Sequence, residues 1–151
     1  YEAFKNAGLD MVFVQDNQSL SKKGVIRGLH YQKTYPQGKL VRALAGMVYD
    51  VAVDLRKNSK TYGKWHGVTL SDQNHRMFYI PEGFAHGFLV LSEEAVFTYK
   101  CTNFYHPEDE GGIAWNDPEL AIDWPIGPDM EIALSDKDKK HPLFKDNRIT
   151  F

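Results

Sequence analysis

The fold is decided by an alternating stretch at residues 47–55, with the sequence MVYDVAVDL. Apolar residues recur there with period two, which is the pattern of a β-strand because successive side chains point to opposite faces. We therefore predict a strand that is buried on one face. One face carries Met47, Tyr49, Val51, Val53 and Leu55, and the other carries Val48, Asp50, Ala52 and Asp54.

The same alternation recurs along most of the chain. Residues 95–101 share it, with Ala95, Phe97, Tyr99 and Cys101 on one face. Shorter candidate strands lie at 11–15, 25–32, 39–44, 65–70, 76–80 and 86–91. Turn-forming clusters separate them, and the intervals are too short for the crossover helices of a parallel sheet. The sequence therefore predicts an all-β fold, an antiparallel sandwich or barrel.

Few segments of the sequence indicate a helix. Residues 1–7 are predicted to form a short helix ending at Gly8, because glycine tolerates the left-handed cap conformation. After Tyr105 the sequence becomes polar and contains five prolines, and we expect this tail to wrap the barrel as loops and short helical turns. Trp115 and Trp124 within it are interpreted as packing anchors. We predict a single domain over residues 1–151.

Composition disfavours several classes of protein. The 151 residues carry 18 Lys+Arg against 20 Asp+Glu, a net charge of −2, so we expect neither a nucleic-acid nor a membrane partner. The apolar runs are far shorter than the ~20 residues that span a bilayer. Cys101 is the only cysteine, so we expect no internal disulfide and a cytoplasmic location.

Common nucleotide-binding and nucleophile motifs are absent from the sequence. It contains no G-x-G-x-x-G and no G-x-x-x-x-G-K-[ST], so a nicotinamide cofactor or ATP is not supported. No serine lies in G-x-S-x-G, and Cys101 falls inside a predicted strand. Any chemistry is therefore expected to need little more than proton transfer.

Basic side chains provide the first candidate site. Such residues lie on or beside several predicted strands. A small barrel has one mouth, and basic groups converging there would suit a phosphorylated or otherwise anionic ligand. Taken alone, a strand lysine or histidine is more commonly a solvated or structural residue. The residues concerned are Arg27, His30, Lys39, Arg42 and His86.

The segment P-x-G-x-x-H at residues 81–86 is similar to half of the second motif of the cupin barrels. In metal-binding cupins this histidine joins an H-x-H pair and a glutamate around a divalent ion. Here His30 is followed by Tyr31 and Gln32, so the H-x-H pair is missing. Two histidines without a placed carboxylate make a poor transition-metal cage, and we expect no bound metal. A metal-dependent cupin enzyme using His30 and His86 is the alternative from another reaction class.

Six ordered segments resemble the dTDP-4-dehydrorhamnose 3,5-epimerases and together cover nearly the whole chain. They are GVIRGLHYQ (24–32), QGKLVR (37–42), DVAVDLR (50–56), IPEGFAHGF (80–88), YKCT (99–102) and LSDKD (134–138). The resemblance implies a cupin-like antiparallel jelly-roll barrel, homodimeric and without metal or cofactor. It also implies epimerisation of dTDP-4-dehydro-6-deoxy-D-glucose at C3 and C5 to dTDP-4-dehydro-L-rhamnose. The alternatives are a single-centre epimerase acting only at C3 or only at C5, and a sugar-nucleotide binding module without catalysis.

The resemblance also assigns catalytic roles. His30 is the base, and Asp138 accepts a hydrogen bond from its other ring nitrogen. Tyr99 is the acid on the far face of the sugar ring, and Lys39 lies near the enolate oxygen. Without the resemblance, Tyr99 would be interpreted as a core residue and Lys39 as an exposed strand end. Asp138 would be interpreted as part of a solvated charged loop, in which Asp136 is its nearest rival.

The family's binding positions match eight residues of this sequence. Arg27 and His86 are the expected contacts for diphosphate and sugar oxygens, and residues 15–17 for the nucleoside. The family also has roughly thirty residues before the point at which this sequence begins, and we expect that segment to be missing from the printed sequence. The matching residues are Gln15, Asp16, Asn17, Arg27, Lys39, His86, Glu110 and Lys137.

Overall fold

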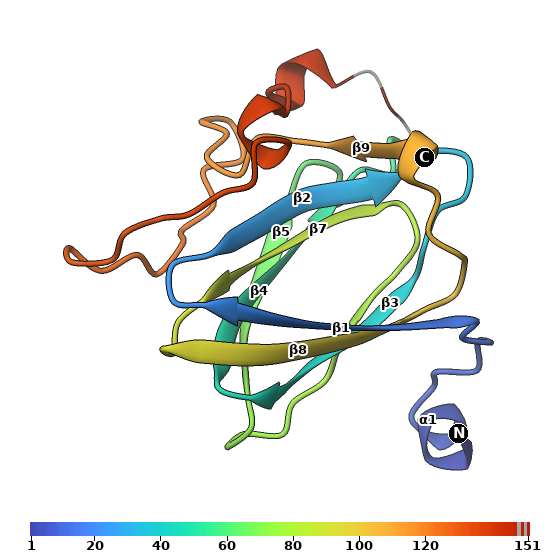
Figure 1. Cartoon of the computed structure of the whole chain (residues 1–151). Helices are drawn as coiled ribbons and strands as arrows, with labels where there is room; N and C mark the ends of the chain where they lie inside the picture. Colours follow the sequence, from blue (N-terminus) through green and yellow to red (C-terminus); the bar gives the residue numbers. More distant parts are fainter. Residues whose placement is uncertain (148, 150) are drawn as a thin grey trace.

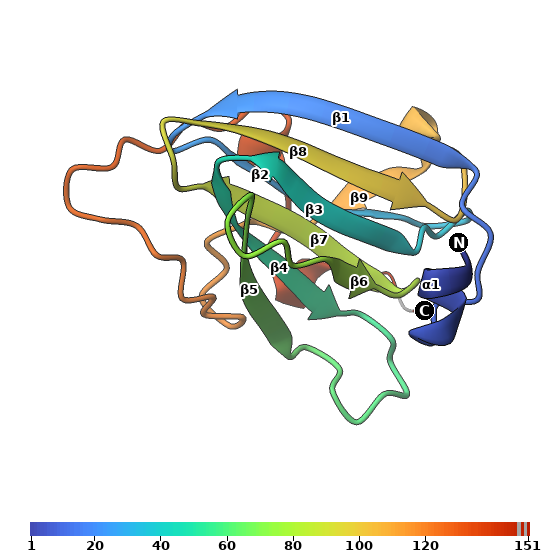
Figure 2. The same cartoon turned by 90° about the horizontal axis from the view of Figure 1, so that it is seen from below.

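The computed structural model describes residues 1–147, 149 and 151. Within this part of the chain, nine strands form two antiparallel sheets that face each other (Figures 1 and 2). One sheet has the strand order β1-β8-β3-β6 and the other β5-β4-β7-β2-β9. The predicted all-β antiparallel fold is confirmed. The strands are β1 (Gln15–Lys22), β2 (Ile26–Gln32), β3 (Lys39–Ala45), β4 (Met47–Asp54), β5 (Trp65–Ser71), β6 (Phe78–Ile80), β7 (Phe84–Val90), β8 (Glu94–Cys101) and β9 (Glu110–Gly112).

The strand predicted from the alternating stretch is observed as β4, between β5 and β7. Both of its faces are buried, which differs from the one-sided burial expected. One face packs against the four-stranded sheet, and the other packs beneath the C-terminal tail. The first face carries Val48, Asp50 and Ala52, and the second carries Val51 and Val53.

The C-terminal tail causes this two-sided burial. Leu120, Trp124 and Phe144 are buried in one cluster with the outer face of the five-stranded sheet, and Trp115 packs against that cluster. The described part of the tail contains three short 3₁₀ helices, separated by β9 and by loops (Figure 1). They are η1 (Pro107–Asp109), η2 (Asp138–Lys140) and η3 (Phe144–Asp146). The predicted wrap of loops and helical turns, with tryptophans as packing anchors, is confirmed.

The N-terminal segment agrees with the prediction only in part. The expected short helix is confirmed as α1 (Glu2–Asn6), and Gly8 follows it with a φ of +85°. The expected strand at 11–15 is wrong, because β1 begins at Gln15 and pairs with β8 as far as Lys22. This strand is mostly polar, so apolar periodicity does not reveal it. No helix among the described residues is long and apolar enough to cross a membrane.

Strands β2 and β7 approach each other closely at Gly28. A Cβ atom there would lie 2.6 Å from the carbonyl oxygen of His86 and 2.7 Å from Cα of Gly87. The φ of Gly28 is +114°, which side chains of L residues rarely adopt. Glycine therefore permits the approach, and His30 pairs with His86 across the two strands. Two of the predicted site histidines are brought side by side in this way.

Asp54 at the end of β4 anchors the loop that follows. Its carboxylate accepts hydrogen bonds from the backbone and guanidinium of Arg56 at 2.9 Å, and from the hydroxyls of Ser59 and Thr61 at 2.6 Å. Burial alone would raise the pKa of Asp54, but these hydrogen bonds outweigh it and hold the pKa well below its usual range.

Replacing Asp54 with alanine is expected to lower the free energy of unfolding by about 3 kcal/mol, because a buried acceptor of several hydrogen bonds is lost. Urea denaturation measures the change, with exposed Asp129→Ala as the control. The folded-state pKa lies below the unfolded value of about 4, so the stabilisation is complete above that pH. The difference between wild type and variant should shrink as the pH falls further, and a pH-independent difference would contradict this assignment.

Candidate active site

A cavity of about 310 Å³ lies between the two sheets. Strands β1, β3 and β8 of one sheet and β2, β7 and β9 of the other contribute to its wall, together with the tail. Most of its lining is polar or charged, as a site for an anionic ligand requires. The lining residues are Gln15, Asn17, Arg27, His30, Gln37, Lys39, His86, Gly87, Phe88, Tyr99, Tyr105, Glu110 and Lys137.

The structure brings together most of the residues singled out from the sequence. Nine of them line this cavity, and Asp138 lies directly behind His30. Asp16 does not join them, because alternation along β1 turns it to the outer face, where it pairs with Lys100 at 2.8 Å. The nine are Gln15, Asn17, Arg27, His30, Lys39, His86, Tyr99, Glu110 and Lys137.

The expected convergence of Arg42 with the other basic residues is wrong. Arg42 lies three residues after Lys39 on β3, and an odd spacing in a strand places two side chains on opposite faces. Arg42 is exposed and lines a hollow on the outer face of the four-stranded sheet.

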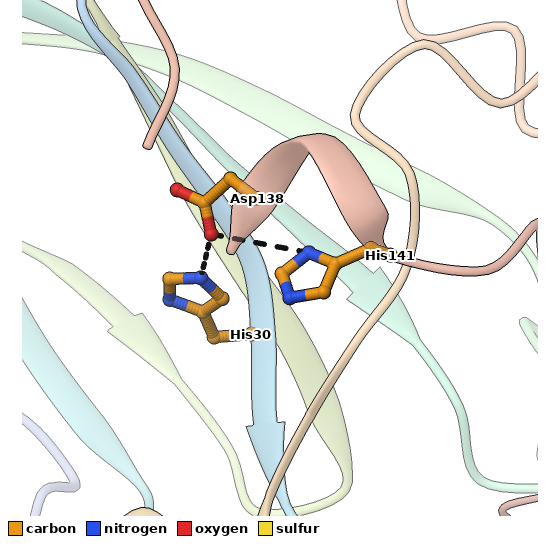
Figure 3. A group of neighbouring side chains, drawn as sticks. All are labelled: His30, Asp138 and His141. Atoms are coloured by element: carbon orange, nitrogen blue, oxygen red, sulfur yellow. Dashed lines mark hydrogen bonds and ion pairs between the residues drawn. The ribbon is translucent and has the colours of Figure 1, made fainter. Parts of the chain in front are cut away.

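His30 and Asp138 form the tightest polar contact of the site. His30 Nε2 and Asp138 Oδ1 are 2.5 Å apart, so Nε2–H donates to the carboxylate and Nδ1 is left as the nitrogen that can accept a proton (Figure 3). Asp138 Oδ2 accepts a longer hydrogen bond from the Gly28 N–H at 3.4 Å. Burial tends to raise the pKa of Asp138, but the hydrogen bond and charge of His30 outweigh it and lower the pKa.

The η2 turn places the Asp138 carboxylate beside His30. The hydroxyl of Ser135 accepts a hydrogen bond from the Asp138 N–H at 3.1 Å, which fixes the start of this turn. Asp138 is 4% exposed, so it is not the solvated loop residue that composition alone suggests. The rival Asp136 is exposed and lies 3.6 Å from Lys139. Between the two carboxylates, only Asp138 contacts His30.

Tyr99 and Lys39 approach the cavity from the four-stranded sheet, whereas His30 belongs to the other sheet. Lys39 Nζ lies 5.9 Å from the centre of the Tyr99 ring. Burial raises the pKa of Tyr99, so its phenol stays protonated and able to donate at neutral pH. Burial lowers the pKa of Lys39, and the charges of Cys101 and Asp50 oppose that shift. Lys39 is thus not the exposed strand end that its residue type suggests.

A second histidine–carboxylate pair was missed by the sequence analysis. His86 Nε2 lies 2.9 Å from Asp50 Oδ2, and both side chains are buried. Burial raises the pKa of Asp50 and lowers that of His86, although each partner opposes the shift of the other. The position of Asp50 between Val48 and Ala52, on one face of a predicted buried strand, was the available signal.

Glu110 completes the electrostatic surroundings of His30. Its Oε1 lies 3.6 Å from His30 Nδ1, and its carboxylate forms an ion pair with Lys137. The Tyr105 hydroxyl donates to Glu110 Oε2 at 3.3 Å. The cavity lining also includes four residues that the sequence analysis did not single out, and three of them lie in the segments that resemble the family: Gln37, Gly87, Phe88 and, outside those segments, Tyr105.

One group of side chains among the described residues lies close enough to hold a metal ion. It comprises His30, Asp138 and His141, whose ligand atoms all lie within 4.8 Å of one another. His86 does not belong to this group, because its ring contacts Asp50 instead. The histidine pair considered from the sequence is therefore not the metal-compatible group of the structure.

A jelly-roll-like barrel that holds an imidazole, a phenol and a carboxylate around one cavity is typical of a cupin-type isomerase. The chain belongs to the dTDP-4-dehydrorhamnose 3,5-epimerase family, whose model matches residues 1–146. It is 56% identical over 146 residues to the dTDP-4-dehydrorhamnose 3,5-epimerase of Methanothermobacter thermautotrophicus, a match that covers 97% of this chain and 79% of that protein.

Solved structures agree with this assignment. The dTDP-6-deoxy-D-glucose-3,5-epimerase of Legionella pneumophila, in complex with dTDP-4-keto-L-rhamnose, is 56% identical with a TM-score of 0.89, over 94% of this chain and 75% of that one. A 3′-monoepimerase from Streptomyces bikiniensis, in complex with dTDP-quinovose, is 35% identical with a TM-score of 0.85, over 94% and 72%. The predicted family, enzyme class and cupin-like fold are confirmed.

Proposed function

We propose that this protein epimerises dTDP-4-dehydro-6-deoxy-D-glucose at C3 and C5 to give dTDP-4-dehydro-L-rhamnose. Curated relatives that carry the name of this 3,5-epimerase are 52–57% identical to the chain. The observation that supports the reaction best is the placement of His30 and Tyr99 on different sheets around one cavity. Inversion of a carbon centre needs a proton removed from one face and another delivered to the opposite face, so two such groups are required.

The substrate itself makes proton removal feasible. Its C4 ketone acidifies the protons on C3 and C5, because the electron pair of the broken C–H bond moves onto the ketone oxygen as an enolate. His30 Nδ1 takes the proton, and Asp138 stabilises the resulting imidazolium through Nε2. Lys39 stabilises the enolate oxygen, and Tyr99 gives its phenol proton to the opposite face of the carbon. We propose that these proton transfers need no cofactor.

The remaining cavity residues are assigned to binding. We propose that Arg27 and His86 hold diphosphate and sugar oxygens, and that Gln15 and Asn17 approach the nucleoside. The guanidinium of Arg27 suits a diphosphate because its planar set of donors matches phosphate oxygens. Glu110 and Lys137 are assigned to the same substrate, and for Asp16 the same role stays a prediction.

The test of this function is proton NMR of the substrate in deuterated buffer. Deuterium at both C3 and C5 and inversion at both carbons are expected. Inversion at one carbon alone would instead identify a single-centre epimerase, the activity named for the 3′-monoepimerase relative. Binding without exchange would identify a binding module, and activity lost on metal removal would identify a metal-dependent enzyme.

Replacing Tyr99 with phenylalanine is expected to separate exchange from inversion. His30 should still remove protons, so deuterium should still enter C3 and C5. Inversion should slow by about 100-fold, because the proton donor on the far face is lost. Proton NMR in deuterated buffer measures both quantities, and Tyr79→Phe outside the cavity lining is the matched control. Full epimerisation by Tyr99→Phe would exclude this tyrosine as the required acid.

We further propose a homodimer that forms through the outer face of the four-stranded sheet. Leu20, Leu44 and Met77 are 62%, 45% and 39% exposed there. The same face contains a hollow of about 340 Å³ that Leu44 and Met77 help to line. Large apolar side chains that are exposed on one face of a sheet are typical of a protein interface.

Replacing Leu44 with glutamate is expected to convert the dimer to a monomer, because a charge would be buried in the interface. Analytical ultracentrifugation measures the change in mass. Ile126→Glu, on an exposed part of the tail, is the matched control and should stay dimeric. A monomeric wild type would contradict the proposal, and so would a dimer that Leu44→Glu leaves intact.

We also propose that residues 1–151 form a single domain and that the protein acts in the cytoplasm. The interior shared by both sheets, and the tail packed against one of them, support the first proposal. The buried free thiol of Cys101 supports the second, because a reducing compartment keeps thiols free.

A further inference from the structure

His141 has no part in the reaction described above, yet its side chain is buried beside the catalytic pair. It is 9% exposed, and its ring meets that of His30 edge-on, with centroids 5.3 Å apart and planes at 88°. Figure 3 shows His30 and His141 on two sides of the Asp138 carboxylate. Two imidazoles and one carboxylate, from β2 and from the tail around η2, thus converge on one point.

The Nδ1 atom of His141 is the unusual feature of this cluster. It is buried and has no hydrogen-bond partner among the described residues. It faces Asp138 Oδ1 at 3.9 Å, which is too long for a hydrogen bond. A buried polar atom without a partner is costly, so its position calls for an explanation. A cation held between Nδ1 and the Asp138 carboxylate would give this buried atom a partner.

The backbone makes room for His141 at this position. A Cβ atom on Gly112 of β9 would overlap the His141 ring, so glycine at that point allows the ring to pack beside β9. Asp138 begins η2 and His141 follows its last residue, and a spacing of three residues in a 3₁₀ helix brings both side chains to the same side of the turn. Packing against Gly112 therefore helps to fix the orientation of the His141 ring.

We propose that His30 Nε2, Asp138 Oδ1 and His141 Nδ1 form a binding site for a divalent transition-metal ion, with Zn²⁺ as the preferred ion, and that the bound ion inhibits epimerisation. Two histidines and a carboxylate are a donor set that Zn²⁺ accepts, with bonds of about 2.0–2.2 Å. Tetrahedral ligands at such distances lie about 3.3 Å apart. The 2.5 Å contact between His30 Nε2 and Asp138 Oδ1 must therefore widen by about 0.8 Å, and the 3.9 Å contact of His141 Nδ1 must close by about 0.6 Å. Water would take the fourth position of the tetrahedron.

Inhibition follows from where the ion binds. Zn²⁺ takes the lone pair of His30 Nε2, so the Nε2 proton is released to solvent and the hydrogen bond to Asp138 is lost. The ion's charge then opposes the protonation of Nδ1, which is the step required of the base. Metal binding needs no epimerase activity, whereas the inhibitory part of this inference rests on the proposed function.

Direct binding to the chelator-treated protein is the first measurement. Co²⁺ titrated into the wild type should give visible absorption bands of a nitrogen–oxygen site that saturate at one equivalent, and Zn²⁺ should abolish them. His141→Gln should weaken binding by roughly 100-fold, since loss of even an outer partner of a metal site costs 10- to 100-fold. His66→Gln is the matched control, because this exposed histidine lies outside the cluster. Equal binding by wild type and His141→Gln, or no bands at all, would overturn the proposal.

A second measurement does not depend on the variant folding. In the wild type with ¹⁵N-labelled histidine, Zn²⁺ should shift the imidazole signals of His30 and His141 and leave that of His66 unchanged. Shifts confined to other histidines would overturn the proposal.

Activity assays then test inhibition. Zn²⁺ should inhibit the wild type over the concentration range in which it binds, and His141→Gln should need roughly 100-fold more Zn²⁺ for the same fractional loss. Binding without inhibition would overturn the inhibitory part alone. If the protein binds added Zn²⁺ but shows no epimerase activity in the absence of metal, the proposed function would be overturned and the proposed metal site would not.

Discussion

Replacing His30 with alanine is expected to lower turnover by about three powers of ten while leaving dTDP binding within a few-fold of wild type. The loss is large because a positioned general base contributes 10²- to 10⁴-fold to proton transfer. Binding persists because the diphosphate contacts are assigned to other residues. Deuterium exchange at C3 and C5 measures the chemical step, and isothermal calorimetry with dTDP measures binding.

His106→Ala is the matched control for His30→Ala. His106→Ala removes a histidine that lies outside the cavity lining and contacts Glu108, so exchange should stay normal. Near-normal exchange at both carbons by His30→Ala would refute its role as the base. Loss of dTDP binding together with exchange would show instead that the replacement disturbs the whole cavity.

Replacing Asp138 with asparagine is expected to lower turnover by about three to four powers of ten, although the side chain keeps its shape. Only a carboxylate both accepts a hydrogen bond from His30 Nε2–H and stabilises the imidazolium once it forms. An amide that turns its NH₂ group toward Nε2 would favour the tautomer with the proton on Nδ1, where the base must be free. The expected result is a fall in kcat with little change in dTDP affinity.

Asp136→Asn is the matched control for this second variant. It makes the same chemical change two residues away, at an exposed carboxylate that does not contact His30. Steady-state kinetics should show wild-type turnover for Asp136→Asn. If the two variants lost activity equally, the local charge of the loop would explain the effect, and the assigned pairing of His30 with Asp138 would be wrong.

The predicted strands supplied the parts of the site that lie on sheets, and the resemblance supplied the roles of Lys39 and Tyr99. Lys39 pairs with Cys101 across β3 and β8, and Tyr99 lies two residues before Cys101, so alternation places Lys39 and Tyr99 on one face. The same argument applies to Arg42 and shows why the expectation for it was wrong: its parity places it opposite Lys39. The alternation in the sequence therefore already argued against the predicted convergence of Arg42 with the other basic residues.

Other features needed the tertiary structure. The contact between His30 and Asp138 joins residues 108 apart, and it exists only because the tail packs on the five-stranded sheet. Local composition around Asp138 is that of a solvated loop, so burial there cannot be read from neighbouring residues. β1 escaped prediction for a related reason: its inward face lines a cavity, which selects polar side chains and removes the apolar alternation.

The tail that packs on the five-stranded sheet therefore does more than bury apolar residues, because it also holds Asp138 beside His30. Local opening of a chain segment can occur at a lower free energy than global unfolding. If the η2 turn detaches while both sheets remain intact, His30 loses its carboxylate although the rest of the barrel is unchanged. The lifetime of the competent enzyme is then set by the weakest segment that carries a catalytic group, and not by the melting of the β-sheets.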